Sequence, residues 1–369
     1  MTLAAPIDEG APTGTKTVPL FVVGSTGMLA GELLRLVDAH PVLRLAGAVS
    51  RDAGRPLQEL HPHLGPSETV DLATATAAMR TALEDPEARV ALVLGLPHGA
   101  SASAWRALRS ELGDAAERVL VVDLSADYRL RDAQVYTSWY GHDHADPDEL
   151  PRFVYGLPEL GRDDLVGARR VAAPGCFATA LQLATAPAVR AGLLDADGPW
   201  NYSAVTGSSG SGVVPSKTTH HPFRNGNLWA YGLGGHRHEA ELAQTLARYG
   251  VEPEVCFVPH SGPFARGIHL TAMLPLARVL GEAEARAAYA DAYRDEPFVR
   301  LEDEAPDLRR VVGSNSSALG VFVRGRTLLV LTVLDNMIKG GAGQALQSMN
   351  LMLGLPEHQS LPRLGLGVV

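Results

Sequence analysis

The sequence predicts an α/β protein with two domains, a parallel-sheet domain followed by a mixed α+β domain, and a C-terminal helix that returns to the first domain. Three observations support this prediction. Short apolar runs alternate with helical patterns up to residue 172, a glycine turn joins the first run to the first helix, and longer strands follow. Apolar strands that alternate with helices are typical of a parallel sheet covered on both faces. A chain of 369 residues is long enough for two such domains.

Composition and charge describe an ordinary globular chain, with 46% hydrophobic and 20% charged residues. The net charge of -9 and the lack of a Lys/Arg-rich run argue against a nucleic-acid partner and favour a small-molecule ligand. Two cysteines are too few for a disulfide framework, which indicates a reducing compartment such as the cytoplasm. Residues 1–16 lack the pattern of a signal peptide and are expected to form a disordered leader. No later apolar run reaches membrane-spanning length, so no membrane partner is expected.

A glycine turn separates the first expected strand, residues 18–23, from the helical pattern of residues 32–37. The spacing Gly24-x-x-Gly27-x-x-Ala30 is a variant of the dinucleotide fingerprint, in which small residues let the backbone approach a pyrophosphate at a helix N-terminus. A tight turn without a ligand is the alternative. The residues expected to bind a dinucleotide here are Gly24, Ser25, Thr26 and Gly27.

The second expected strand, residues 43–49, ends at Ser50 and Arg51. An NAD-binding fold usually places a carboxylate at this point to hold the ribose 2′-hydroxyl, and none is present. A hydroxyl and a guanidinium can instead bind a 2′-phosphate, so the sequence favours NADP over NAD. The alternative is a solvated turn.

Two further strands, expected at 90–96 and 119–122, extend the parallel pattern. Pro97 and His98 follow the first of them, and Asp123 follows the second. Ligands of parallel sheets collect at the carboxyl ends of the strands. These residues are therefore candidates for cofactor contact, and structural turns are an equal alternative.

Cys176 directly follows Pro174-Gly175 and precedes a helix-forming run. Near a helix N-terminus, unpaired N–H groups and the positive end of the dipole favour a thiolate, the nucleophilic form of cysteine. The alternative is a small buried hydrophobe. Cys256 falls inside a strand expected at 255–259 and is predicted to be a core residue.

Polar motifs follow the cysteine. The glycine loop 206–212 can bind an anion through backbone N–H groups or serve as a flexible connection. Four histidines within residues 220–238 raise a zinc hypothesis, but His236 and His238, at i and i+2, do not share a helix face. A histidine acting as acid/base for the cysteine is favoured, and no metal is expected.

The remaining strands are expected at 255–259, 268–274, 318–323 and 328–334, with an amphipathic helix over 282–293. A glycine turn after Asp335 opens the last helix.

Several of these motifs together resemble the N-acetyl-gamma-glutamyl-phosphate reductases, within the wider group that includes the aspartate-semialdehyde dehydrogenases. The similarity covers nearly the whole chain after residue 17. The motifs that carry it, in chain order, are residues 24–27, 50–51, 96–99, 123–130, 155–160, 174–176, 236–238 and 335–340.

The resemblance implies a Rossmann NADP-binding domain formed by residues 17–173 with 339–369, and a catalytic and oligomerisation domain formed by 174–338. It implies NADPH as the cofactor and a homodimer or homotetramer. It makes Cys176 the nucleophile, places His236 and His238 near it without deciding which is the acid/base, and puts Asn336 and Lys339 at the nicotinamide.

The implied reaction is the reduction of N-acetyl-gamma-glutamyl phosphate to the semialdehyde and phosphate in arginine biosynthesis. Cys176 would form a thioester, and NADPH would deliver a hydride to it. Arg224 and the loop containing Ser209 and Gly210 are expected to bind the substrate's carboxylate.

One departure leaves the substrate open. The family usually carries an arginine soon after the Ser-Gly-x-Gly loop, and residues 213–214 are both valine here. His220-His221-Pro222 with Arg224 resembles instead the reductases of lysine biosynthesis, which act on an aminoadipyl or glutamyl phosphate attached to an amino-group carrier protein. A non-catalytic dinucleotide sensor and a zinc hydrolase are the rivals from other classes.

Overall fold

Seven parallel strands form the first sheet, in the order β3-β2-β1-β4-β5-β7-β6. The computed structural model describes residues 16–367, so residues 1–15 of the expected leader lie outside it. β1 pairs with β2 on one side and with β4 on the other, so the winding of the chain reverses between β1 and β4. A crevice at the carboxyl ends of two such strands is where doubly wound folds bind their ligands. The strands are β1 (Val18–Val23), β2 (Leu43–Val49), β3 (Thr69–Val70), β4 (Val90–Leu94), β5 (Val119–Asp123), β6 (Val154–Tyr155) and β7 (Arg170–Ala172).

Helices cover both faces of this sheet, as its apolar strands require. Leu20 and Val22 of β1 belong to a core shared with α1 and α11, whereas Phe21 and Val23 face a second core with α3 and α4. The prediction of an α/β fold is therefore confirmed. The helices are α1 (Met28–Val37), α2 (Leu57–Leu60), α3 (Leu72–Ala82), α4 (Ser101–Leu112), α5 (Ala133–Tyr140), α6 (Pro158–Leu165), α7 (Cys176–Arg190), α8 (His221–Arg224), α9 (His238–Ala247), α10 (Glu282–Ala292) and α11 (Gly343–Leu353).

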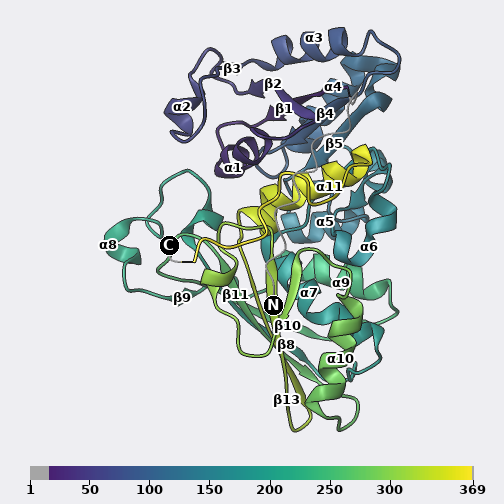
Figure 1. Ribbon diagram of the computed structural model, residues 1–369, viewed down its shortest axis with the longest axis vertical. Coiled ribbons are helices and arrows are strands. Elements are labelled where there is room, and N and C mark those ends of the chain that lie inside the picture. The colour runs from purple at the N-terminus through teal and green to yellow at the C-terminus, as the bar shows by residue number, and fades with distance from the viewer. Residues whose placement is uncertain (1–15, 368–369) are drawn as a thin grey trace, which may run out of the picture.

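The second sheet is mixed, with the order β12-β13-β14-β11-β8-β10-β9. Its core is formed with α7, α9 and α10, which lie along one side of the sheet in Figure 1. In β8, β10 and β11, buried residues on this side alternate with half-buried or exposed residues on the other. The strands are β8 (Trp200–Thr206), β9 (Trp229–Ala230), β10 (Val255–Ser261), β11 (Ile268–Pro275), β12 (Val299–Glu302), β13 (Ser317–Arg324) and β14 (Thr327–Leu334).

That alternation corrects the expectation for Cys256. The residue lies in β10 as predicted, but its side chain is exposed. Its neighbour Phe257 occupies the buried side of the strand. Because side chains alternate between the two faces of a strand, a residue inside a strand is not thereby a core residue. The sequence analysis also gave no ranges for six of the strands, which are β3, β6, β7, β8, β9 and β12.

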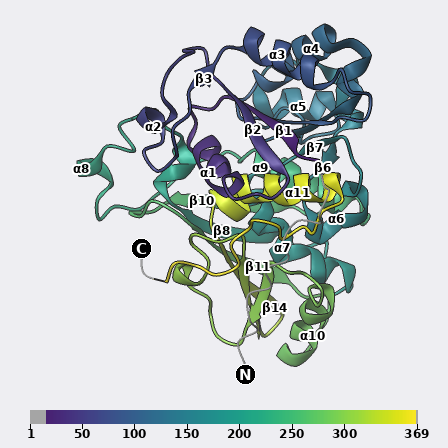
Figure 2. The same ribbon diagram turned by 45° about the horizontal axis from the view of Figure 1, so that its top comes forward.

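The C-terminal helix returns to the first domain, as the sequence predicts. A π-helical turn, η5 (Ile338–Ala342), leads into α11, and Leu346 and Met349 of α11 pack in the core that contains β1 and α1. Figure 2 shows α11 between the first sheet and α7. No helix among residues 16–367 has the length and apolar character needed to span a membrane.

Candidate active site

The Cys176 turn lies where the two sheets meet. β7, the last strand of the first sheet in chain order, ends at Ala172, and α7 begins at Cys176 with Gly175 as its N-cap. A Cβ at Gly175 would lie 2.2 Å from Nε2 of His238, so only glycine fits between the turn and this imidazole. On the other side, a Cβ at Gly340 would lie 2.7 Å from Cβ of Cys176. Cys176 and the turn before it thus lie between the His238 ring and the η5 turn.

Burial raises the pKa of the Cys176 thiol, and this effect outweighs the groups that favour the thiolate. Arg129, the Phe177 N–H and Arg237 lower the pKa, and Glu241 adds to the increase. The expectation that the helix N-terminus makes Cys176 a thiolate is therefore wrong for the protein without ligands. The free-energy penalty of removing a thiolate from water is larger here than the stabilisation that the nearby positive charges provide. The thiol needs a base.

His236 and His238 are both neutral bases beside the cysteine. Burial and the Arg237 charge lower the pKa of His236 to about 4. Burial, reinforced by the neighbouring histidine and arginines, holds the pKa of His238 well below its usual value. The rings are 4.6 Å apart, and the ring of Phe177, which follows the nucleophile, lies 5.7 Å from His236 and 6.0 Å from His238. The His238 backbone N–H donates to Nδ1 of His236, so the neutral His236 ring carries its proton on Nε2.

Glu241 is a central residue that the sequence analysis missed. Its carboxylate is fully buried, accepts hydrogen bonds from the Gly175 N–H (3.0 Å) and the Tyr155 hydroxyl (2.7 Å), and pairs with Arg129 at 3.3 Å. Its Oε1 lies 3.9 Å from Nε2 of His238. Nε2 is the ring nitrogen that faces Gly175, whereas Nδ1 is buried and has no hydrogen-bond partner within residues 16–367. The i, i+3 spacing of His238 and Glu241 on a predicted helix was the available signal.

The glycine turn after β1 has the features of a pyrophosphate site. Gly24 has φ +91°, and a Cβ there would lie 2.6 Å from the Gly95 carbonyl oxygen, so the close approach of β1 and β4 requires glycine. Gly27 caps α1 without a side-chain hydrogen bond, which leaves the first N–H groups of the helix open to an anion. Ser25 is buried and donates to the Val49 carbonyl at 3.0 Å.

His61 supports the same turn and was not singled out in the sequence. Its Nε2 donates to the Ser25 carbonyl at 2.8 Å, and its ring packs against Gly31 of α1. A Cβ at residue 31 would lie 2.4 Å from Nδ1 of His61. No local sequence pattern links His61 to Gly31, so the sequence could not predict this contact.

Ser50 and Arg51 lie at the carboxyl end of β2, beside the glycine turn. The Ser50 hydroxyl accepts from the Asp52 N–H at 3.2 Å, and Arg51 is exposed. Pro97 and His98 follow β4 on the other side of the crevice, and Nδ1 of His98 accepts from the Ala126 N–H at 3.1 Å. The structure thus brings the expected cofactor residues of three loops to one edge of the sheet.

Asn336 and Lys339 do not present their side chains to this crevice. The Asn336 amide accepts from the Gly267 N–H at 2.7 Å and donates to the Ser209 hydroxyl at 2.9 Å, so it joins two loops. Lys339 is fully buried and pairs with Glu159 at 2.6 Å. In this segment it is the backbone at Gly340 that lies against Cys176.

The expected substrate residues lie in two interlocked loops. Ser209 donates its hydroxyl to the Ala265 carbonyl at 2.7 Å, and Gly210 follows it in a short 3-10 turn, η3 (Ser208–Ser211). The loop is therefore a fixed turn. Arg224 is 7% exposed, and its guanidinium donates to the Ser261 hydroxyl (2.9 Å) and to two carbonyls of the 262–264 loop. Its observed contacts are within the protein, and its substrate role stays a prediction.

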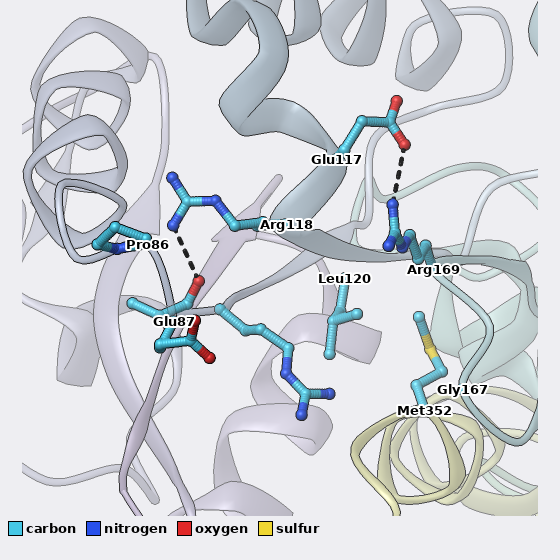
Figure 3. A pocket seen from close by; sticks show the side chains of 10 residues that line it. Pro86, Glu87, Glu117, Arg118, Leu120, Gly167, Arg169 and Met352 are labelled. Atoms are coloured by element: carbon cyan, nitrogen blue, oxygen red, sulfur yellow. Dashed lines mark hydrogen bonds and ion pairs between the residues drawn. The ribbon is translucent and has the colours of Figure 1, made fainter.

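A separate hollow of about 300 Å³ lies at the amino-terminal ends of β4 and β5, opposite the cysteine (Figure 3). Two of the three arginines that line it are already engaged, because Arg118 donates to backbone carbonyls and Arg169 pairs with Glu117. Within residues 16–367 no group of three His, Cys, Asp or Glu side chains is arranged to hold a metal ion.

Comparison with known proteins agrees with this division of the chain. Residues 20–168 match the model "Semialdehyde dehydrogenase, NAD binding domain", and residues 176–336 match "Semialdehyde dehydrogenase, dimerisation domain". Aspartate semialdehyde dehydrogenase II of Vibrio cholerae has the same fold, with a TM-score of 0.64 at 14% identity, over 92% of this chain and 99% of that one.

Two relatives are named N-acetyl-gamma-glutamyl-phosphate reductase and are 42% identical: that of Halorhodospira halophila, over 93% of this chain and 98% of the relative, and that of Saccharopolyspora erythraea, over 95% and 99%. A protein of Thermomicrobium roseum, named putative [LysW]-L-2-aminoadipate 6-phosphate reductase, is 39% identical over 95% and 99%. With such identity along nearly the full length of these relatives, the chain belongs to the N-acetyl-gamma-glutamyl-phosphate reductase family of semialdehyde dehydrogenases.

Proposed function

We propose that the protein reduces N-acetyl-gamma-glutamyl phosphate to the corresponding semialdehyde and phosphate, with NADPH as the reductant. One observation carries the proposal. A cysteine at the start of α7 lies between a neutral imidazole backed by a buried carboxylate and the turn that joins the second domain to α11. An acyl-phosphate reductase needs a nucleophile, an acid/base and a bound hydride donor at one place.

The crevice fits a dinucleotide phosphate. Gly24 and Gly27 leave room for a pyrophosphate against the uncapped start of α1, and a side chain at Gly24 would collide with the Gly95 backbone. Arg51 makes no ion pair or hydrogen bond through its guanidinium with any residue from 16 to 367, so it is available to a 2′-phosphate. NADPH bound there would supply the hydride.

The covalent and proton-transfer steps belong to residues of this chain. His238, whose Nε2 faces the Gly175–Cys176 turn, takes the Cys176 proton, and Glu241 stabilises the resulting imidazolium. Sγ bonds to the acyl carbon as the bond to the phosphate oxygen breaks, and the phosphate leaves with that electron pair. After hydride transfer the thiolate leaves the carbon, and the aldehyde is released.

The test uses purified protein, NADPH and N-acetyl-gamma-glutamyl phosphate. We expect NADPH oxidation by the unmodified protein, none by Cys176→Ser, and normal turnover by Cys256→Ser, since Cys256 is exposed on the second sheet. His238→Asn should lower kcat by about two decades or more, and His236→Asn by less. Full activity of Cys176→Ser would contradict the proposed mechanism.

A carrier-bound substrate is the second candidate, favoured by the Thermomicrobium roseum relative. The stretch from η3 to β9 exposes Val213, Val214, Phe223 and Leu228, a surface that a carrier protein could contact. Turnover of carrier-bound aminoadipyl phosphate, together with no activity on the free acetylated compound at millimolar concentration, would select this candidate.

Two further proposals concern assembly and location. We propose that a second copy covers the half-exposed face of the second sheet, because the matching family model is a dimerisation domain. We also propose that the protein works in the cytoplasm, where both of its free cysteines would stay reduced.

A further inference from the structure

The phosphate that leaves during the proposed reaction needs its own binding groups. An acyl phosphate carries about two negative charges on its phosphoryl oxygens, and this chain has a net charge of -9. A cation with free donors must therefore lie beside Cys176. This question rests on the proposed function, because it concerns the group that Cys176 displaces.

Two arginines act on the Cys176 thiol, and they differ in what they already bind. Arg129 is 6% exposed and donates to the Ala173 carbonyl (2.8 Å), the Leu124 carbonyl (3.1 Å) and Glu241 (3.3 Å). Three of its five N–H donors hold the strand ends and the carboxylate, and the side chain is buried. Arg129 therefore contributes charge to the site from a position already fixed by the protein.

Arg237 is free to bind a ligand. Its side chain is exposed, lies in the turn between the two histidines, and makes no hydrogen bond or ion pair with any residue from 16 to 367. Its Cζ lies 5.9 Å from the centroid of the Tyr140 ring, which supports the guanidinium through a cation–π contact. Arg237 also acts electrostatically on Cys176, His236 and His238, so its charge is close to all three.

The Tyr140 hydroxyl is a second unused donor at the same place. The oxygen is buried and has no hydrogen-bond partner within the described chain. Its ring lies 6.1 Å from that of His98 and stacks on Tyr136 at 4.6 Å, so its position is fixed. A buried hydroxyl without a partner is costly, and a ligand oxygen would satisfy it.

We propose that Arg237 and the Tyr140 hydroxyl bind the phosphoryl group of the acyl phosphate and, in the reverse direction, inorganic phosphate. The guanidinium suits a phosphate because its planar N–H pairs match two phosphate oxygens. Tyr140 ends α5 of the first domain, whereas Arg237 precedes α9 of the second. The phosphate therefore bridges the two domains beside Cys176. As Sγ bonds to the acyl carbon, the departing oxygen keeps the electron pair of the broken C–O bond, and these donors stabilise its charge.

The reverse reaction separates phosphate binding from the rest of the chemistry. With semialdehyde and NADP but no phosphate, the unmodified protein should give a burst of NADPH equal to the enzyme concentration, because thioester formation needs no phosphate. Steady turnover then requires inorganic phosphate to release the acyl group. The burst amplitude reports on thioester formation, and the KM for phosphate reports on the proposed site.

For Arg237→Ala we expect an unchanged burst amplitude and a KM for phosphate raised about tenfold or more. Arg237→Lys keeps the charge but lacks the paired N–H groups, so its KM for phosphate should lie between those of the unmodified protein and Arg237→Ala. Tyr140→Phe keeps the ring under the guanidinium and should raise the KM about threefold. Arg324→Ala removes the same charge at the far β13–β14 hairpin and should leave both quantities unchanged.

An unaltered KM for phosphate in Arg237→Ala would overturn the proposal. Loss of the burst in that variant would also overturn it, because Arg237 would then act in thioester formation. A missing burst in the unmodified protein is a different failure, since it would refute the proposed function itself.

Discussion

At Cys176, burial and the positive surroundings act on the thiol in opposite directions. The Phe177 N–H and two arginines favour the thiolate, as a helix N-terminus does in general, but burial has the larger effect and raises the pKa. The neutral state of His238 is the complement of this result, because a protonated imidazole could not accept the thiol proton. Cys176 and His238 are therefore both neutral before the reaction, and the proton passes between them during it.

Alkylation of Cys176 tests this acid–base state directly. In a Cys256→Ser background, the rate of reaction with iodoacetamide should rise with pH and reach its midpoint above the ordinary thiol value, because only the thiolate reacts and its formation is disfavoured. Rates are measured by mass spectrometry between pH 6 and about 10. A midpoint near neutral pH would show a thiolate already present at rest.

Arg51 is the residue that should distinguish the two nicotinamide cofactors. Removing one charge-assisted bidentate contact costs about 1.5 to 3 kcal/mol, so Arg51→Ala should weaken NADPH binding by roughly one to two decades and leave NADH nearly unchanged. Fluorescence titration of both cofactors measures the effect. Arg55→Ala is the matched control, because Arg55 is nearby but paired with Glu59 at 3.3 Å. An equal loss for both cofactors would contradict the assignment.

At the scale of elements, η5 is held in place by a buried ion pair. Lys339 of η5 and Glu159 of α6 are both nearly inaccessible to solvent, and Gln347 of α11 accepts a second hydrogen bond from the ammonium at 2.9 Å. The η5 turn touches Cys176 through Gly340. The Lys339–Glu159 pair thus fixes the backbone next to Cys176. Lys339 therefore has a structural role and positions the η5 turn.

Breaking this pair should lower stability more than cofactor affinity. Lys339→Met leaves the Glu159 carboxylate buried without its partner, which costs about 3 to 5 kcal/mol of unfolding free energy. The double variant Glu159→Leu with Lys339→Met should recover most of that loss, because no charge then stays buried. Urea denaturation gives the free energies, and NADPH titration of the folded variants should show little change. A large loss of NADPH affinity without loss of stability would indicate that Lys339 contacts the cofactor after all.

At the scale of the whole molecule, ion pairs cross between the two domains around the site. Arg266 in the second domain pairs with Glu32 of α1 at 2.9 Å, and within its own domain it pairs with Asp335, which precedes η5, at 3.0 Å. The Arg129–Glu241 pair makes a similar link at the cysteine turn. These contacts explain how residues from both sheets keep a fixed geometry at one site.

The half-exposed face of the second sheet should form the contact between subunits. Met273 lies on that face in β11 and is 37% exposed. Met273→Asp would place a charge in a desolvated contact and should convert the dimer to a monomer, as measured by light scattering after size exclusion. Val166→Asp, at a residue 58% exposed after α6, is the matched control and should stay dimeric. A dimer that survives Met273→Asp would place the interface elsewhere.

Local patterns were enough to predict much of this molecule. The parallel sheet, the glycine turn at Gly24 and Gly27, the helix that starts at Cys176 and the return of α11 all follow from periodicity, turn chemistry and resemblance. Each depends on residues close together in the sequence, where strand and helix periods and capping rules apply.

The sequence by itself therefore determined the fold class and the family, and it predicted Cys176 as the nucleophile. Only the tertiary structure decided which groups are free to react. It left Cys176 half-buried with a raised pKa and put Glu241 near His238. It paired Arg129 and Arg224 with groups of the protein and left Arg237 exposed. It also turned Lys339 inward and Cys256 outward. The physical reason is that burial and pairing depend on contacts between distant segments, as in the 112-residue separation of Arg129 from Glu241, and a local pattern carries no record of them.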